Sequence, residues 1–180
     1  MIQKKFRQIG SLLIIITITY LGGCAKDMTE MKTVDYIDID RFMGSWYVIA
    51  NIPTFLEKDI YEAIETYNLN DDGTIGTVFT FKRGGFDGAE KEYNPKGFIV
   101  DKETNALWGM QFVWPIKADY RIVYIDNDYS KTIIARQKRD FVWIMAKTPT
   151  ITESEYDELV SFVESIGYDT SLIQRIPQIQ

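Results

Sequence analysis

The sequence predicts an all-β fold: an eight-stranded antiparallel up-and-down barrel with one C-terminal α-helix packed outside. Three features of the 180-residue chain indicate this class. Apolar runs of strand length recur from residue 44 to residue 147, turn sequences separate them, and a single helical pattern follows the last run. Short links between successive strands favour antiparallel neighbours. An open two-layer sheet is the structural alternative.

The first 24 residues have the layout of a bacterial lipoprotein signal. A basic head precedes an uncharged apolar run over residues 11–21, which is too short to span a bilayer comfortably. The segment Leu21-Gly22-Gly23-Cys24 resembles a lipobox, and Cys24 is the only cysteine of the chain. We expect residues 1–23 to be removed as a signal peptide and the Cys24 thiol to be diacylated. An ordinary secretory signal that contains a cysteine is the alternative.

Residues 24–35 are polar and lack hydrophobic periodicity, which predicts a lipidated tether between the membrane and the fold. Two acyl chains anchor a protein stably where a single chain would be marginal. Residue 25 is alanine and not aspartate. By the sorting rule of enteric bacteria, this implies an outer-membrane lipoprotein that faces the periplasm.

Eight strands are expected, with turn signals such as Asp71-Asp72-Gly73 and Asp101–Asn105 between them. The predicted strands cover residues 44–51, 61–69, 74–81, 97–100, 106–114, 120–125, 132–137 and 141–147. One helix follows the last strand. Thr152 and Glu155 have capping-box spacing, an apolar stripe continues at helical spacing, and Gly167 marks the helix end.

Composition argues against several kinds of chemistry. The absence of histidine removes Ser-His-Asp and Cys-His catalysis, together with His-ligated zinc and haem. A single cysteine permits neither an internal disulfide nor a thiolate cluster. The formal charge of −6 comes without a basic stripe, which argues against nucleic acid as a partner. No carboxylate pair has a spacing that catalysis requires, so we predict a protein that is not an enzyme and uses neither metal nor cofactor.

Three segments resemble the sequence motifs of the lipocalin family. Gly44-Ser45-Trp46 resembles the first motif, Gly-x-Trp, and Asp128 and Tyr129 stand where the second motif, Thr-Asp-Tyr, would fall. The sequence from Asp140 through the helix is similar to the third motif and helix of bacterial lipocalins, relatives of apolipoprotein D. The resemblance covers residues 36–180, and it implies one barrel domain of the outer-membrane lipoprotein type.

Two positions depart from the family pattern. Lys147 stands where the third motif normally has arginine, and Asn127 replaces threonine in the second motif. In the family, the third-motif cation lies across the first-motif tryptophan, here Trp46, and closes the base of the barrel. Lysine supplies the charge for this cation–π contact but not the planar stacking of a guanidinium. These motifs are structural and leave the ligand open.

An eight-stranded barrel can hold one small ligand, and side chains alternate between inside and outside along each strand. Aligned with the family, this pattern implies an aromatic and apolar interior, as expected of a pocket for an acyl chain. The expected ligand-binding residues are Glu65, Tyr67, Thr77, Phe79, Trp108, Met110, Phe112, Tyr120, Ile122, Tyr124, Phe141 and Trp143. Plain core filling is the alternative for each, and an inverted register would turn all of them outward.

Glu65 is the unusual member of this set, because a carboxylate inside an apolar barrel is costly unless it is paired or protonated. It would pair with a cation or bond a polar ligand head. The competing interpretation carries slightly more weight: Glu65 reaches the rim, or the register slips there.

The loops divide into two groups, one at each end of the predicted barrel. The links after the second, fourth and sixth strands contain six acids against two lysines, whereas charge is balanced at the other end, which is the mouth in lipocalins. Residues 52–57 begin the first loop at the mouth. Phe55 and Leu56 of this loop either contact ligand or membrane, or pack the loop down.

These observations predict an envelope lipid-binding lipoprotein that holds a fatty acid or lysophospholipid in the barrel for storage or transport. Its predicted partners are that lipid and the membrane reached through Cys24. One alternative is a non-catalytic envelope interaction or scaffold module with a filled barrel. The other is a lipid-modifying enzyme, which the lack of histidine and of a spare thiol disfavours.

Overall fold

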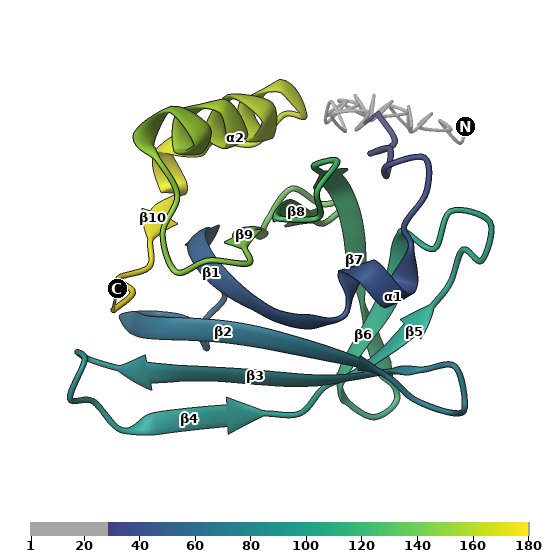
Figure 1. Cartoon of the computed structure of the whole chain (residues 1–180), viewed down its shortest axis with the longest axis horizontal. Coiled ribbons are helices and arrows are strands. Elements are labelled where there is room, and N and C mark those ends of the chain that lie inside the picture. Colours follow the sequence, from purple (N-terminus) through teal and green to yellow (C-terminus); the bar gives the residue numbers. More distant parts are fainter. Residues whose placement is uncertain (1–28, 180) are drawn as a thin grey trace, which may run out of the picture.

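The computed structural model describes residues 29–179 of the chain. The predicted signal peptide, the predicted lipidation site Cys24 and the first residues of the predicted tether lie outside the described residues. Ten strands form one antiparallel sheet, which closes because β1 (Gly44–Ile52) pairs with β9 (Val142–Ala146) (Figure 1). The closed sheet confirms the predicted barrel and rules out the open two-layer alternative.

The barrel strands follow one another around the ring in sequence order. Between β1 and β9 lie β2 (Ile60–Leu69), β3 (Ile75–Arg83), β4 (Glu90–Tyr93), β5 (Lys96–Ile99), β6 (Leu107–Val113), β7 (Ile116–Ile125) and β8 (Lys131–Ala135). Strands β4 and β5 both pair with β3 and together form the fourth side of the ring. The predicted strand over residues 97–100 corresponds to β5, and β4 was not predicted. Pro95 lies between them and has no N–H to donate to a ladder.

The helix α2 (Glu153–Ser165) packs against the outside of the barrel (Figure 1). Thr152 and Glu155 form the predicted capping box, in which each side chain accepts from the other residue's backbone N–H. Leu159 and Val163 of the apolar stripe are buried against barrel residues such as Ile144. The predicted helix and its position are therefore confirmed. A short 3₁₀ turn (Thr170–Leu172) and the strand β10 (Gln174–Arg175), which pairs with β1, complete the chain.

The short helix α1 (Ile39–Phe42) closes one end of the barrel, which we call the base. Phe42 and Trp46 are fully buried there, and the Trp46 indole N–H donates to the Phe42 carbonyl at 2.8 Å. The Lys147 ammonium lies 4.0 Å from the Trp46 ring centroid and donates to the Met43 carbonyl at 2.8 Å. Burial lowers the pKa of Lys147 to about 8. The family resemblance implies this cation–π contact with Trp46 at the base, and here lysine makes it in place of arginine.

The second motif also belongs to the base. Tyr129, next to Asp128 in the β7–β8 turn, accepts the Asp38 N–H on its hydroxyl at 2.9 Å. The Arg41 guanidinium lies 4.1 Å from the Tyr129 ring centroid. Gly44, at the start of β1, has φ of +90°, a conformation that favours glycine. These contacts hold α1 across the closed end.

The chain before α1 lies along the outside of β7. Within the segment predicted as a tether, Met31 is 3% exposed and belongs to the cluster between barrel and helix. The Val34 N–H donates to the Ile122 carbonyl at 3.0 Å. This part of the segment is therefore fixed to the barrel. Over residues 29–179, no helix combines the length and hydrophobicity that crossing a membrane requires.

Candidate ligand-binding cavity

The barrel is filled at its base and hollow above it. The cavity measures about 360 Å³. Its lining comes from the β1–β2 loop, β2, β3, the β6–β7 hairpin, and the ends of β8 and β9. The lining residues are Thr54, Phe55, Leu56, Glu57, Glu65, Phe79, Met110, Phe112, Val113, Ile116, Ala118, Asp119, Tyr120, Arg136, Phe141 and Trp143. We call the end at the β1–β2 loop and the β6–β7 hairpin the mouth.

Most of the residues expected from the sequence to bind a ligand do line this cavity. They contribute aromatic rings, one thioether and one carboxyl: Glu65, Phe79, Met110, Phe112, Tyr120, Phe141 and Trp143. The rings of Tyr120 and Trp143 stack at a centroid distance of 6.3 Å, and Phe141 lies beside Trp143. The inward register of these strands is therefore as predicted.

Four of the expected residues lie in the core outside the cavity lining: Tyr67, Thr77, Trp108 and Ile122. Tyr67 packs edge-on against Trp108, and its hydroxyl makes a short hydrogen bond with that of Tyr120. For these four positions, core filling is the observed arrangement. They form the floor on which a ligand would rest.

Tyr124 is a correction to the predicted set, because its side chain lies outside the barrel. Its ring packs against Phe162 of α2 at a centroid distance of 5.3 Å. The cause is a register shift in the pairing of β7 with β8 between Ile122 and Tyr124. Such a bulge interrupts strict alternation, so Val123 and Tyr124 both join the outer cluster.

Glu65 faces into the barrel and is only 7% exposed, so it neither reaches the rim nor marks a register slip. Burial raises the pKa of the Glu65 carboxyl to about 7. The hydrogen bond with Tyr67 opposes this rise, and the nearby Glu57 carboxylate adds to it. The floor of the cavity thus holds a carboxyl group that exchanges a proton near neutral pH.

Glu57 is a second buried carboxyl in the lining, and it was not among the residues predicted from the sequence. It accepts hydrogen bonds from the Trp143 indole at 3.1 Å, the Thr54 backbone N–H at 3.1 Å and the Asn51 amide at 3.2 Å. Burial raises its pKa, and these donors oppose the rise. Its bonds hold the β1–β2 loop against the cavity wall. The only sequence signal for it is an acid in an apolar loop.

Arg136 brings one positive charge to the mouth, at the end of β8. Its guanidinium lies 5.2 Å from the Phe141 ring centroid and 3.4 Å from the Asp140 carboxylate. Its Nε is buried and has no hydrogen-bond partner among residues 29–179. Arg136 was also not predicted as a site residue, because a cation at a strand end is common in sequences. The same described residues contain no cluster of three or more acid or cysteine ligands suited to a metal ion.

A closed β-barrel with a filled base, an apolar cavity and an open mouth defines a small-molecule-binding barrel protein. The sequence profile of the Lipocalin-like domain family matches residues 37–178. The chain therefore belongs to the lipocalin family.

Curated relatives agree with this assignment. The chain is 33% identical to temperature-induced lipocalin-1 of Arabidopsis thaliana over 156 residues, which cover 83% of each protein. It is 27% identical to the outer membrane lipoprotein Blc of Escherichia coli K12 over 151 residues, 78% of this chain and 79% of Blc. Apolipoprotein D of Bos taurus is 24% identical over 155 residues, 82% of this chain and 76% of that protein.

Solved structures show the same fold. Insecticyanin from the tobacco hornworm Manduca sexta has a TM-score of 0.64 at 18% identity, covering 82% of this chain and 84% of insecticyanin. Lobster apocrustacyanin A1 has a TM-score of 0.63 at 13% identity, covering 79% of this chain and 81% of that chain.

Proposed function

We propose that this lipocalin is an envelope lipoprotein, anchored through acylated Cys24 at the periplasmic face of the outer membrane. It holds a fatty acid or lysophospholipid in its barrel for storage or transport. The observation that carries this proposal is the apolar cavity of about 360 Å³. This volume lies near the lower end of the usual range for ligand pockets, about 300–1,000 Å³, which favours a single acyl chain.

The cavity also argues against the alternative of a scaffold with a filled barrel. An empty apolar space loses the dispersion contacts that its lining atoms would otherwise make, so it favours an apolar occupant. Met110 and the surrounding rings suit an acyl chain, because the flexible thioether adapts to ligand shape. The names of the Blc relatives, which are outer membrane lipoproteins, support the envelope location.

The charges of the lining support one orientation for an anionic lipid. Glu65 disfavours a carboxylate or phosphate at the floor, because like charges in a poorly solvated site repel. Within the described part of the chain, Arg136 at the mouth is the one cationic side chain in the cavity lining, and although Asp140 pairs with it at 3.4 Å, it suits an anionic head better than the floor does. The acyl tail therefore points toward the floor, and the head lies at Arg136.

Native mass spectrometry of the protein purified from its own membranes tests the main proposal. A co-purifying species with the mass of a single-chain lipid is expected. A protein that emerges without any bound lipid, and that also fails to take up added palmitate or lysophosphatidylcholine, would refute it.

Arg136→Gln tests the orientation of the ligand, with Lys138→Gln as the matched control from the same loop. Lys138 is exposed and does not line the cavity. Loss of a charge-assisted hydrogen bond at a partly exposed site is expected to weaken palmitate binding roughly tenfold. Hexadecanol, which has the same chain and no charge, should bind both variants like the wild type. Trp143 fluorescence reports binding from within the cavity.

The position of Glu65 also favours a second candidate, a lipid-modifying enzyme. A buried carboxyl with a pKa of about 7 is suited to general acid–base work. Incubation with single-chain lipids, analysed for products by mass spectrometry, separates the two functions. A product that Glu65→Gln abolishes would favour the enzyme, whereas unchanged lipids favour the binding protein.

A further inference from the structure

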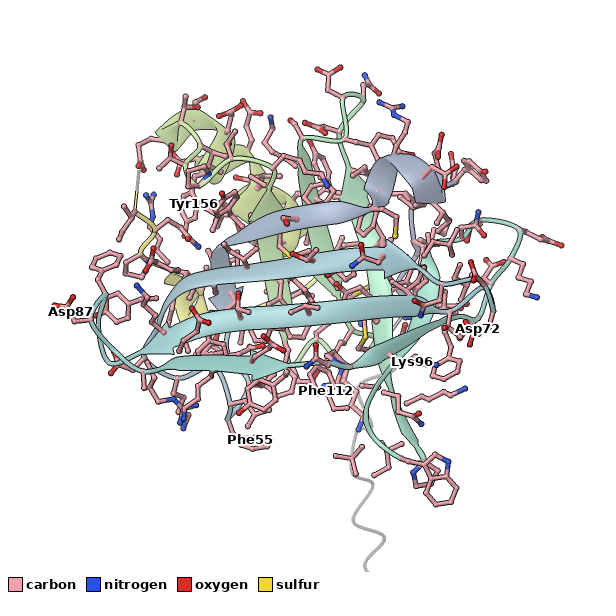
Figure 2. All side chains as sticks on the ribbon, turned by 60° about the horizontal axis from the view of Figure 1, so that its bottom comes forward. Phe55, Asp72, Asp87, Lys96, Phe112 and Tyr156 are labelled. Carbon is pink, nitrogen blue, oxygen red and sulfur yellow. The ribbon has the colours of Figure 1, made fainter. Side chains whose placement is uncertain are left out.

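Large apolar side chains surround the mouth of the barrel and remain exposed. They are Phe55, Phe112, Val113, Trp114 and Ile116, between 50% and 82% exposed, and we call them the apolar rim. Phe55 comes from the β1–β2 loop and the other four from the β6–β7 hairpin. All except Trp114 line the cavity, so the rim borders one opening. Figure 2 shows Phe55 and Phe112 along one edge of the molecule, with Tyr156 of α2 near the opposite edge.

Such a surface requires an apolar or interfacial partner. A scattered exposed side chain needs no explanation, but a contiguous cluster that borders an opening marks an interaction site. Trp114 stands at the hairpin tip, and tryptophan is enriched where protein meets the headgroup region of a membrane. Lys117, which directly follows Ile116, is exposed, and its positive charge suits the headgroup region of an anionic leaflet.

The described chain begins at the same end of the barrel. The Thr29 carbonyl accepts hydrogen bonds from Arg139 at 3.1 Å and from Gln137 at 3.3 Å. Both donors belong to the β8–β9 loop, whose neighbouring residues Arg136 and Phe141 line the mouth. The chain is thus fixed beside the mouth before it runs down β7 to the base.

The distance to the proposed anchor is short. Cys24 precedes Thr29 by five residues. Five residues reach at most about 18 Å even when fully extended. An acylated Cys24 therefore keeps the β8–β9 loop, and with it the mouth, within that distance of the lipid. The base lies at the far end of the barrel and cannot be brought to the membrane without turning the mouth away from it.

We propose that the apolar rim docks onto the phospholipid leaflet that holds the anchor, with the barrel mouth facing the membrane. This orientation rests on the proposed lipidation of Cys24. An acyl chain then passes between bilayer and cavity without crossing water. The base turns carry the acidic residues Asp71, Asp72, Asp101, Glu103, Asp126 and Asp128, and docking at the mouth keeps them away from an anionic surface.

Tryptophan quenching on the processed lipoprotein tests this orientation. The protein is reconstituted into phosphatidylcholine vesicles whose acyl chains carry bromine, which quenches tryptophan only on close approach. Trp46 and Trp108 are buried in the base, and Trp143 faces the cavity, so the exposed Trp114 is the reporter at the rim. We expect the brominated lipid to quench the wild type, and Trp114→Phe to lose most of that quenching.

The matched control moves the reporter to the base. Val100 is exposed in the β5–β6 turn, so Val100→Trp combined with Trp114→Phe places a tryptophan at the opposite end. We expect little quenching of this variant by the brominated lipid. Equal quenching of the mouth and base reporters, or no quenching of Trp114 in protein that floats with the vesicles, would overturn the proposal.

Flotation in a density gradient separates failure of the anchor from failure of the orientation. A chain that does not float, but whose Trp114 is still quenched when vesicles are added, would refute the lipid anchor and support the rim as a membrane surface. Neither flotation nor quenching would refute both. Flotation of the wild type, together with quenching confined to Trp114, supports both.

Discussion

Replacement of Glu65 by glutamine should change how stability depends on pH. The Glu65 carboxyl has a pKa of about 7 in the folded barrel, against an ordinary value of 4.5. Between these pH values, the folded protein holds a proton that the unfolded chain has released. The free energy of unfolding therefore falls as pH rises through this window. The difference between the two pKa values corresponds to about 3 kcal/mol lost by pH 8.

Glu65→Gln keeps the size of the side chain and removes its titration. We expect the variant and the wild type to have similar stability near pH 4.5, and the variant to be more stable at pH 8 by up to about 3 kcal/mol. Urea unfolding of lipid-free protein, followed by tryptophan fluorescence from pH 4.5 to pH 8.5, measures the difference.

Glu153→Gln is the control for this experiment. The ion pair with Arg175 lowers the pKa of Glu153, so its titration lies below the window. This variant should leave the slope between pH 5 and pH 8 unchanged. A constant difference between wild type and Glu65→Gln across that range would refute the reasoning, as would a variant that is less stable at pH 8.

Three further outcomes follow from the same structure. Hexadecanol should bind the wild type less tightly as pH rises through 7, because the ionised Glu65 would then lie beside the apolar chain of the ligand. The hexadecanol affinity of Glu65→Gln should stay constant over the same pH range in the same fluorescence titration. Tyr124→Ala should lower the free energy of unfolding by about 1–2 kcal/mol, because the contact with Phe162 is lost, and should leave palmitate affinity unchanged. Phe141→Ala should weaken palmitate binding, because Phe141 lines the cavity. Equal losses of affinity in the two variants would contradict the outward placement of Tyr124. Lys147→Met should lower stability by about 1–3 kcal/mol in urea, since the Met43 carbonyl loses its donor and the Trp46 ring its cation, and Lys147→Arg should retain most of the wild-type stability.

The barrel could be predicted from sequence because its signals are local. Alternation along β3 and β6, aligned with the family, placed Phe79 and Met110 on the inside, where the structure has them. The capping box at Thr152 likewise fixed where α2 begins. For Glu65 the favoured interpretation, a rim position or a register slip, was wrong, because the residue is buried inside the barrel. Every second side chain of a regular barrel strand faces the interior, so the sequence of such a strand alternates with a period of two residues.

The residues that were misplaced or missed lie where the regular alternation of a strand is interrupted or the strand ends. Val123 and Tyr124 are both apolar, so their sequence contains no sign of the bulge that turns both outward. Glu57 enters the cavity because the β1–β2 loop folds back onto Trp143, and Arg136 does so at the end of a strand. Neither position has a periodic pattern, since loop paths depend on tertiary contacts.

Charged and apolar side chains are distributed unequally between the base and the mouth, so the two ends of the barrel differ. The buried carboxyl of Glu65 and the acidic turns lie away from the solvent-exposed rim, while Arg136 and the apolar rim gather at the mouth. A single-chain anionic lipid has the matching asymmetry, with one apolar end and one charged end. A tail that leaves a bilayer through the rim would reach the cavity first, and its head would stop at Arg136 beside the membrane surface. The orientation of the ligand in the barrel and the orientation of the barrel on the membrane therefore support each other.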